Sequence, residues 1–212
     1  MAPSERKFWN LVIAGVGGQG TILTNAVLGR AVARSGLEVV TAETHGMAQR
    51  YGRITIHLRI GPEVHGALIP SGGADVLLGL EPLETLRSIE CCSQRTLVLM
   101  NRQVVRPPSL ALSWRAHYPS LEEIERRLQQ VAGTVLSLEA HELARQAGTI
   151  LATNAVMLGA LCATAELPIP AELIRQALFE VVPAKAQEIN RDAFEMGRAW
   201  AHLAQKSSCH QS

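Results

Sequence analysis

The sequence predicts an α/β protein with a mostly parallel, open, Rossmann-like sheet, helices on both faces, some antiparallel pairing and a helical C-terminal region. Three observations support this prediction. Short apolar runs of the parallel-strand type alternate with helical segments. A glycine-rich turn joins the first run to the first helix, and from about residue 139 the pattern is helical throughout. Aromatic residues make up only 4% of the chain, so the core must be aliphatic and alanine-rich.

The first predicted unit is a strand, a glycine turn, a helix and a second strand. The strands cover Asn10–Ala14 and Leu37–Ala42, and the turn covers Gly15–Gly20. Apolar residues at helical spacing predict a helix over Thr21–Ser35, and Gly36 is a natural C-terminal cap. Together these segments predict one βαβ unit with a right-handed crossover.

The next segments alternate between polar loops and apolar runs. The polar, glycine-bounded Glu43–Gly52 is expected to be a loop at the carboxyl end of the second strand. Arg53–Ile60 alternates apolar and polar residues, which predicts a strand with one solvent-exposed face, and Val64–Ile69 is a candidate hairpin partner for it. The remaining predictions are strands over Asp75–Leu80, Thr96–Met100 and Thr134–Leu138, and helices over Pro82–Ile89 and Leu121–Val131.

The chain is predicted to form a single domain over residues 10–205, between tails at 1–9 and 206–212. Its helical part includes Ala171–Val182 and a terminal helix that Pro183 introduces. The uncharged segment Gln146–Ala165 is about as long as a membrane span. Its polar and small residues, with no aromatic flanks, favour a buried helix instead. We expect no membrane attachment, no signal peptide and a cytoplasmic location.

Composition excludes several classes of protein. The chain has 20 Lys+Arg against 19 Asp+Glu and no basic run, which disfavours a nucleic-acid partner. The four cysteines, at positions 91, 92, 162 and 209, form no C-x-x-C pair and have no histidine at metal-ligand spacing. We therefore expect no metal site and no iron–sulfur cluster on this chain, and reduced, structural cysteines.

The glycine turn satisfies the dinucleotide-binding pattern G-x-G-x-x-G, because it follows a strand and opens a helix. Glycines allow the tight turn, and the first amides of the helix point toward an anionic group. Glu43, at the end of the second strand, is placed to accept a hydrogen bond from a ribose hydroxyl. On this turn alone, a nucleotide site and a ligand-free structural turn remain equally open. Gly18 and Gln19 add hydrogen-bonding capacity that nicotinamide binding does not require.

Several motifs in order give a more specific resemblance. From about Asn10 to about Gly197, the sequence resembles the gamma subunit family of 2-oxoacid:ferredoxin oxidoreductases. The matching motifs are GVGGQG at Gly15–Gly20, ETHGMAQR at Glu43–Arg50, HLRIG at His57–Gly61, ADVLLGLEPLETLR at Ala74–Arg87 and NAVMLGA at Asn154–Ala160.

The resemblance implies an accessory subunit with no catalytic residue and no turnover of its own. In that family a 2-oxo acid is decarboxylated on thiamine diphosphate, electrons leave through [4Fe–4S] clusters to ferredoxin, and coenzyme A captures the acyl group. Thiamine diphosphate and the clusters are then expected on a larger partner subunit, with coenzyme A as co-substrate. Arylpyruvates such as indolepyruvate are the expected substrates, and an apolar surface should remain exposed where the partner docks.

The resemblance also implies a set of residues at a ligand site or active-site mouth. The glycine amides suit a phosphate or carboxylate, Arg50 and Arg59 can bind a carboxylate or a coenzyme A phosphate, and His45 can carry a proton. Each has a structural alternative: the arginines can form salt bridges, Glu81 can be a helix N-terminal carboxylate, and Asn154 can tie down backbone. The candidates are Gly15, Gly17, Gly18, Gln19, Gly20, Glu43, His45, Gly46, Met47, Gln49, Arg50, Tyr51, Arg59 and Glu81.

The sequence departs from the family pattern after Gln49 and Arg50, where two glycines and a small residue are usual. Here Tyr51, Gly52 and Arg53 stand instead, which adds bulk and charge. This departure leaves the identity of the 2-oxo acid open. Two other functions also remain: a free-standing NAD(P)- or flavin-binding dehydrogenase of Rossmann type, and a nucleotide-sensing or scaffold module.

Overall fold

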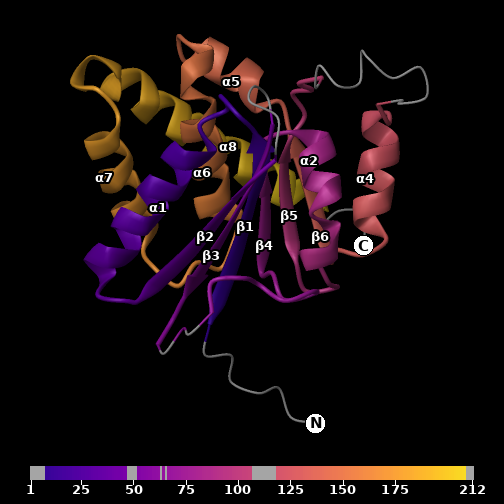
Figure 1. The fold of residues 1–212 in the computed structure, drawn as a ribbon. Coiled ribbons are helices and arrows are strands. Elements are labelled where there is room, and N and C mark those ends of the chain that lie inside the picture. The colour runs from indigo at the N-terminus through magenta and orange to yellow at the C-terminus, as the bar shows by residue number, and fades with distance from the viewer. Residues whose placement is uncertain (1–7, 47–51, 63, 65, 107–117, 209–212) are drawn as a thin grey trace.

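The protein is a three-layer α/β sandwich in which one six-stranded sheet separates two layers of helices (Figure 1). The computed structural model describes residues 8–46, 52–62, 64, 66–106 and 118–208. The strands are β1 (Trp9–Val16), β2 (Val39–His45), β3 (Arg53–Ile60), β4 (Val76–Gly79), β5 (Leu97–Asn101) and β6 (Thr134–Leu138). The helices are α1 (Thr21–Ser35), α2 (Pro82–Arg87), α4 (Leu121–Gln129), α5 (Ala140–Gln146), α6 (Thr153–Thr164), α7 (Ala171–Val181) and α8 (Gln187–Ser208). Short 3-10 turns are η1 (Ile89–Cys91), η2 (Ile150–Ala152) and η3 (Ala184–Ala186).

The sheet confirms the predicted fold class. Its strand order is β2-β3-β1-β4-β5-β6. Strands β1, β4, β5 and β6 are mutually parallel, whereas β3 pairs antiparallel with both β1 and β2. The carboxyl ends of the four parallel strands therefore share one edge with the end of β2 and the beginning of β3.

The two strands of the βαβ unit, β1 and β2, are not neighbours in the sheet. Strand β3 lies between them, so that Ile54 pairs with Gly15 on one side and with His45 on the other. The burial of the two strands explains this order. Strand β3 buries Ile54, Ile56 and Leu58, whereas β2 ends in exposed polar residues that suit the edge of a sheet.

The predicted hairpin over Val64–Ile69 is wrong. Within that range the described residues 64 and 66–69 form no strand. They instead cross the polar side of β3, where the amide of Ile69 donates to His57 Nδ1 (3.2 Å) and Arg59 Nη1 donates to the carbonyl of Gly66 (2.6 Å). The face of β3 that we expected to be exposed is therefore partly covered, and Thr55 is buried.

The loop predicted over Glu43–Gly52 is shorter than expected. Strand β2 continues to His45, because Thr44 pairs with Thr55 and His45 with Ile54 in the ladder. Gly46 then closes the ladder, with its amide 2.7 Å from the carbonyl oxygen of Arg53.

The two helical layers bury alternate residues of the sheet. Leu11 and Ile13 of β1 face a large core built with α1, α5, α6, α7 and α8, whereas Val12 and Ala14 face a smaller core with η1 and α4. The buried helix predicted over Gln146–Ala165 is shorter than expected: α6 is buried along most of its length, whereas Ile150 and Leu151 ahead of it are exposed in η2. In the described part of the chain, no helix is long and apolar enough to cross a membrane.

Helices α6 and α8 pack backbone against backbone through two glycines. A Cβ atom on Gly159 would lie 1.9 Å from the carbonyl oxygen of Phe194, and one on Gly197 would lie 2.0 Å from that of Val156. Real side chains do not approach this closely, so the crossing requires glycine at both positions. This close packing joins α8 to α6 within the large core.

Candidate functional site

The glycine loop lies between β1 and α1, at the carboxyl edge of the parallel strands. Gly18 and Gly20 adopt positive φ angles of 92° and 75°, which favour glycine. Gly20 is the N-cap residue of α1, and no side chain caps the helix there. The first turn of α1 therefore presents its amides at this edge, as the sequence predicted.

The carboxamide of Gln19 folds back into the loop. Its Oε1 accepts from the amide of Val16 (3.0 Å), and its Nε2 donates to the carbonyl of Leu80 at the end of β4 (3.1 Å). A Cβ on Gly15 would lie 3.0 Å from Gln19 Oε1, so the missing side chain at position 15 makes room for this carboxamide. Gln19 thus shapes the loop from inside, and both polar ends of its side chain are occupied by backbone.

The amides of the loop divide into occupied and accessible ones. The amide of Gly17 donates to the carbonyl of Gly52 (2.9 Å), and the amide of Gln19 donates to that of Val16 (3.2 Å). The amide of Gly18 makes no hydrogen bond to any residue that the structure describes, and a Cβ there would have nothing within 4 Å. Gly18 and the first turn of α1 are therefore the part of the loop open to a ligand.

Asn154, at the beginning of α6, holds the backbone of the glycine loop through two hydrogen bonds. Its Nδ2 donates to the carbonyl of Gln19 (2.9 Å) and to that of Gly20 (3.3 Å). The prediction that Asn154 ties down backbone is confirmed.

Glu43 and His45 lie on the outer strand rather than beside the glycine loop. Asn25 of α1 donates to Glu43 Oε1 (3.1 Å), and Glu43 Oε2 lies 3.6 Å from His45 Nε2. Because β3 intervenes, β2 is displaced from β1 by two strand spacings, about 10 Å. An acid at the end of β2 is therefore not in the position from which dinucleotide-binding folds contact a ribose.

The remaining candidates fall in different places. Arg59 lies near the far end of β3, about 20 Å along the strand from Arg53. It donates to Asn10 Oδ1 (3.1 Å) and lies over the ring of Phe8, so it is not part of this edge. Gly46 is at the edge, next to the beginning of β3. Met47, Gln49, Arg50 and Tyr51 lie outside the described residues.

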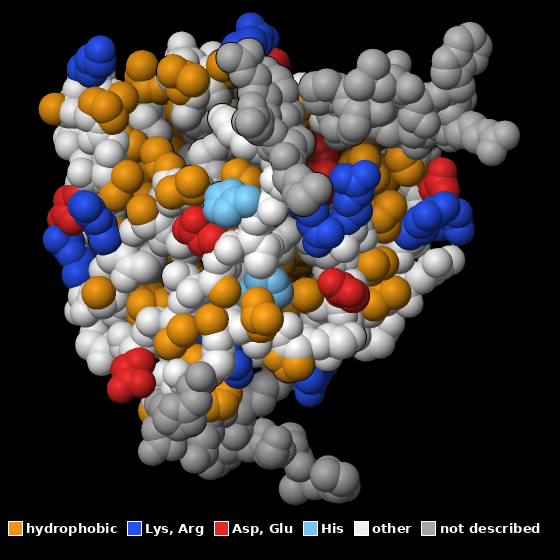
Figure 2. All heavy atoms as spheres, in the orientation of Figure 1, with side chains coloured by type: hydrophobic (Ala, Val, Ile, Leu, Met, Phe, Trp, Pro, Cys, Tyr) orange, Lys and Arg blue, Asp and Glu red, His pale blue; other side chains and the backbone are white. Residues whose placement is uncertain are grey.

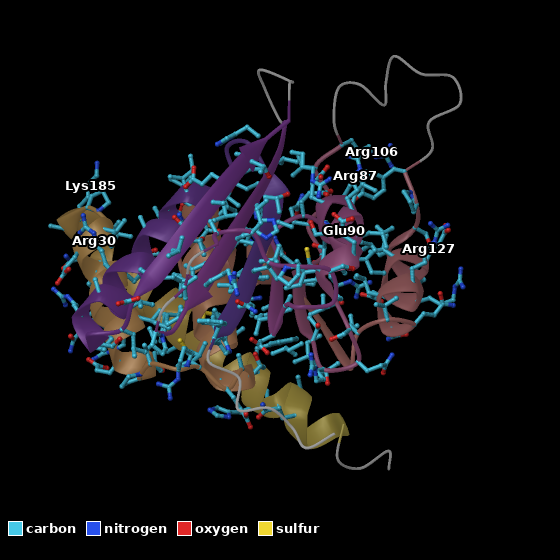
Figure 3. The ribbon with its side chains drawn as sticks, turned by 60° about the horizontal axis from the view of Figure 1, so that its bottom comes forward. Arg30, Arg87, Glu90, Arg106, Arg127 and Lys185 are labelled. Atoms are coloured by element: carbon cyan, nitrogen blue, oxygen red, sulfur yellow. The ribbon has the colours of Figure 1, made fainter. Side chains whose placement is uncertain are left out.

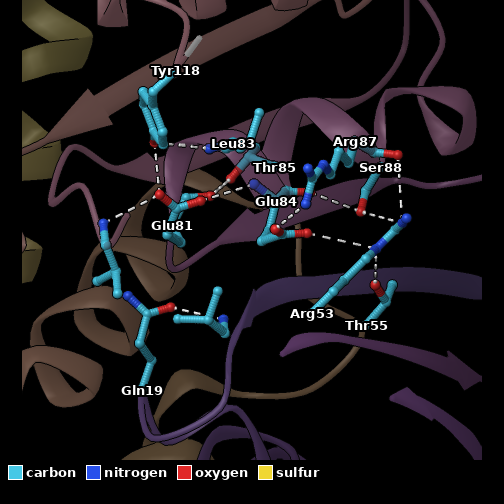
Figure 4. A network of polar contacts seen from close by, with 12 residues as sticks. Gln19, Arg53, Thr55, Glu81, Leu83, Glu84, Thr85, Arg87, Ser88 and Tyr118 are labelled. Atoms are coloured by element: carbon cyan, nitrogen blue, oxygen red, sulfur yellow. Dashed lines mark hydrogen bonds and ion pairs between the residues drawn. The ribbon is translucent and has the colours of Figure 1, made fainter. Parts of the chain in front are cut away.

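Glu81 is the buried N-cap of α2, with 1% of its surface exposed (Figure 4). Its Oε2 accepts from the amide of Glu84 (2.9 Å), and its Oε1 accepts from the Tyr118 hydroxyl (2.6 Å) and the amide of Val105 (3.3 Å). Burial and the bond to Glu81 raise the pKa of Tyr118. The interpretation of Glu81 as a helix N-terminal carboxylate is confirmed.

Helix α2 buries a second carboxylate, Glu84, which forms an i, i+3 pair with Arg87. Glu84 is 1% exposed and contacts both Arg87 and Arg53 (Figure 4). Burial raises the pKa of Glu84, and so does the neighbouring Glu81, whereas the two arginines lower it.

Large apolar side chains are exposed on two elements next to the loop, α1 and η2. Ile22 in the first turn of α1 is 55% exposed, and Ile150 and Leu151 of η2 are 48% and 86% exposed. The contacts of Asn154 hold η2 and α6 next to this turn. These three side chains are candidates for the exposed apolar surface that the sequence predicts.

Charged side chains are spread over the surface more widely than hydrophobic ones. Figure 2 shows many hydrophobic side chains over the half of its face where α1 and α7 lie. In Figure 3, Arg30 and Lys185 lie on the α1 and α7 side, whereas Arg87 and Arg127 lie on the side of α2 and α4.

The sheet order and the glycine loop define a Rossmann-like domain with an amide-lined edge. The chain belongs to the pyruvate ferredoxin/flavodoxin oxidoreductase family, which matches residues 10–200. The protein "Indolepyruvate oxidoreductase subunit IorB" of Archaeoglobus fulgidus is 44% identical, over 89% of this chain and 92% of the relative. The protein of the same name from Pyrococcus horikoshii is 40% identical, over 90% and 95%.

Solved structures share the fold at lower identity. The gamma subunit of keto/oxoacid ferredoxin oxidoreductase from Geobacter sulfurreducens matches with a TM-score of 0.64 and 22% identity, over 92% of this chain and 99% of that one. The 2-oxoglutarate:ferredoxin oxidoreductase of Magnetococcus marinus matches with a TM-score of 0.67 and 20% identity, over 94% of this chain but 32% of that one. The predicted family is confirmed, and so is the role of the chain as an accessory subunit of a 2-oxoacid ferredoxin oxidoreductase.

Proposed function

We propose that this chain is the accessory subunit of an enzyme that oxidatively decarboxylates arylpyruvates, such as indolepyruvate, to acyl-coenzyme A. A larger partner subunit holds thiamine diphosphate and the iron–sulfur clusters, and ferredoxin accepts the electrons. The names of the relatives support the substrate class. The cysteines that the structure describes, Cys91, Cys92 and Cys162, are free, and this, with the use of coenzyme A, favours a cytoplasmic location.

The observation that supports this proposal best is the combination of open backbone amides and exposed apolar side chains at the glycine loop, which we call the mouth. Three large apolar side chains are exposed on the elements that follow or support this amide-lined turn: Ile22 on α1, and Ile150 and Leu151 on η2 directly before α6. A self-sufficient active site is a closed pocket, whereas exposed apolar residues around a polar opening are typical of a surface that another chain covers. We place the reaction chamber of the partner against this edge.

In that arrangement the residues of this chain bind and orient, and they perform no step of the chemistry. The amide of Gly18 and the first turn of α1 are aimed at an anionic group. Two groups of the reaction fit: a phosphate of coenzyme A, and the carboxylate of the 2-oxo acid. The end of β2 and the beginning of β3 provide the neighbouring wall, in which His45 remains a candidate for orienting the substrate. Arg50, which lies outside the described residues, remains a candidate from its sequence position alone.

The test is reconstitution of the complex. Coexpression with the thiamine-binding subunit should give decarboxylation of indolepyruvate that depends on coenzyme A and reduces ferredoxin or a viologen dye. Either chain alone should be inactive, and arylpyruvates should react faster than pyruvate or 2-oxoglutarate. Oxidation of a substrate by the isolated chain with NAD or NADP would contradict the proposal.

The alternative of a free-standing dehydrogenase loses support at two residues. Glu43 is separated from the glycine loop by β3, and Gln19 occupies the interior of the loop. Calorimetry with NAD, NADP, FAD and coenzyme A distinguishes the two functions, because micromolar binding of a dinucleotide by the isolated chain would restore the alternative.

A further inference from the structure

Helix α2 buries a carboxylate that is incompletely paired. Glu84 Oε1 accepts from Arg87 Nη1 (2.7 Å). Its Oε2 is buried, has no hydrogen-bond partner among the described residues, and lies 3.7 Å from Arg53 Nε. Burying a carboxylate is costly unless strong partners compensate, so a neutral side chain would be the simpler choice for stability alone. The buried charge of Glu84 is therefore better explained by the side chain that it holds in place.

Glu84 holds the side chain of Arg53, the first residue of β3. Arg53 Nε donates to Thr55 Oγ1 (3.1 Å), and its Nη2 donates to Ser88 Oγ and to the carbonyl of Arg87 (both 3.4 Å) (Figure 4). These acceptors are neutral, with Thr55 on β3 and the other two at the end of α2. Glu84 supplies the negative charge that faces the guanidinium. At 3.7 Å without a hydrogen bond, the attraction depends on that charge.

The backbone next to Arg53 is part of the glycine loop's support. The carbonyl of Gly52 accepts from the amide of Gly17 (2.9 Å), and the carbonyl of Arg53 accepts from the amide of Gly46 (2.7 Å). Displacement of Arg53 would therefore release the amide of Gly17. Gly17 directly precedes Gly18, whose amide is the open one.

We propose that Glu84 is a positioning residue that acts through Arg53 and Gly52 to hold the glycine loop in its binding geometry. The proposal rests on the proposed function in one respect: it takes the amide of Gly18 as the ligand-binding group. Glu84 itself touches no ligand. Glu84 holds the glycine loop on the side facing β3, through Arg53 and Gly52. On the side facing β4, Gln19 holds the loop through its hydrogen bond to Leu80.

Three variants of the full chain test the proposal: Glu84→Gln, Arg53→Met and the double variant. Glu172→Gln is the matched control, because Glu172 pairs with Arg175 at the same i, i+3 spacing on the exposed surface of α7. Exchange of the Gly17 amide, followed by NMR, reports its hydrogen bond to Gly52. We expect about tenfold faster exchange in both single variants and in the double variant, as for loss of a local hydrogen bond. The amide of Ile13 in β1 and the control variant should not change.

The double variant separates positioning from a purely structural role. It leaves no unpaired buried charge, so its thermal stability should recover relative to Arg53→Met, while the exchange of Gly17 stays fast. If the protection of Gly17 recovers together with stability, or never changes, the proposal is overturned.

Kinetics of the reconstituted complex then test the link to the ligand. The same variants should raise the KM for coenzyme A or for the 2-oxo acid while kcat is largely retained. If Gly17 exchanges faster but neither KM changes, Glu84 positions the loop as proposed, and the assignment of Gly18 as the ligand-binding group is overturned.

Discussion

The carboxamide nitrogen of Asn154 lies 2.9 Å from the carbonyl oxygen of Gln19, although the two residues are 135 positions apart in the chain. This contact joins the helical C-terminal third to the glycine loop. The same nitrogen also reaches Gly20, the N-cap of α1. The geometry of the mouth therefore depends on the packing of α6 as well as on the loop's own glycines.

Substitution of Gly20 should expose this dependence. A Cβ there would lie 2.1 Å from Asn154 Nδ2, and its φ of 75° disfavours any side chain. We expect Gly20→Ala to lower the free energy of unfolding by about 3 kcal/mol, from backbone strain and the clash together. Urea unfolding measures this loss. Gly18→Ala is the control, because it shares the positive φ but has open space, and its loss should be smaller.

The double variant Gly20→Ala/Asn154→Ala should be less destabilised than the sum of the single variants, because the clash is then absent. Strict additivity would show that the two residues do not interact.

The crossing of α6 and α8 should be equally sensitive. A methyl group at Gly197 would meet backbone atoms of Val156 that cannot rotate away. We expect Gly197→Ala to cost about 2–3 kcal/mol, as for overpacking of a core. Gly29→Ala in α1 is the control, because a Cβ there has nothing within 4 Å, and it should stabilise by about 0.5–1 kcal/mol. A Tm for Gly197→Ala at or above that of the wild type would contradict this packing.

The stability of the protein should depend on pH through His57. Burial lowers the pKa of His57, and the nearby charge of Arg53 lowers it further, while Glu90 acts in the opposite direction. In the folded state the neutral ring accepts from the amide of Ile69. The unfolded chain therefore binds the proton more readily.

The contribution of His57 is fully present above the pKa of the unfolded histidine, about 6.5, and is lost as pH falls through the lower pKa of the folded state. His57→Gln should reduce the decline in stability between neutral and mildly acidic pH, measured by urea unfolding at each pH. An identical decline in both proteins would show that other groups dominate.

The exposed apolar side chains next to the glycine loop should determine how tightly this chain binds the partner subunit. Leu151→Ser removes the most exposed large side chain next to the loop, and we expect it to weaken binding to the partner subunit by about tenfold or more, as for a central interface residue. Leu68→Ser is the control, because Leu68 is also exposed but lies in the segment across β3. Analytical ultracentrifugation measures both. Equal effects of the two substitutions would place the interface elsewhere.

Local patterns in the sequence were sufficient for most elements, because apolar periodicity and turn residues determine where strands and helices begin and end. They could not predict which strands become neighbours. The insertion of β3 between β1 and β2 depends on the relative burial of two segments, Val39–His45 and Arg53–Ile60, which only the assembled sheet decides.

The site was predictable to a similar degree. The glycine loop, Asn154 and the helix-capping role of Glu81 followed from residue type and position. The importance of Glu84 did not, because Glu84–Arg87 has the same i, i+3 spacing as the exposed pairs Glu142–Arg145 and Glu172–Arg175. Glu84–Arg87 differs from these exposed pairs in its burial and in its contact with Arg53, which comes from a strand distant in the sequence.

The antiparallel direction of β3 has a consequence for how this family can vary. In an all-parallel sheet the connection leaving β2 would cross to the opposite rim before the next strand begins. Here β2 ends and β3 begins at the same rim, and Gly52, directly before β3, contacts Gly17 of the glycine loop. Substitutions at the end of β2 or the beginning of β3 can therefore alter the chemistry beside that loop, while the pairing of the two strands stays in register.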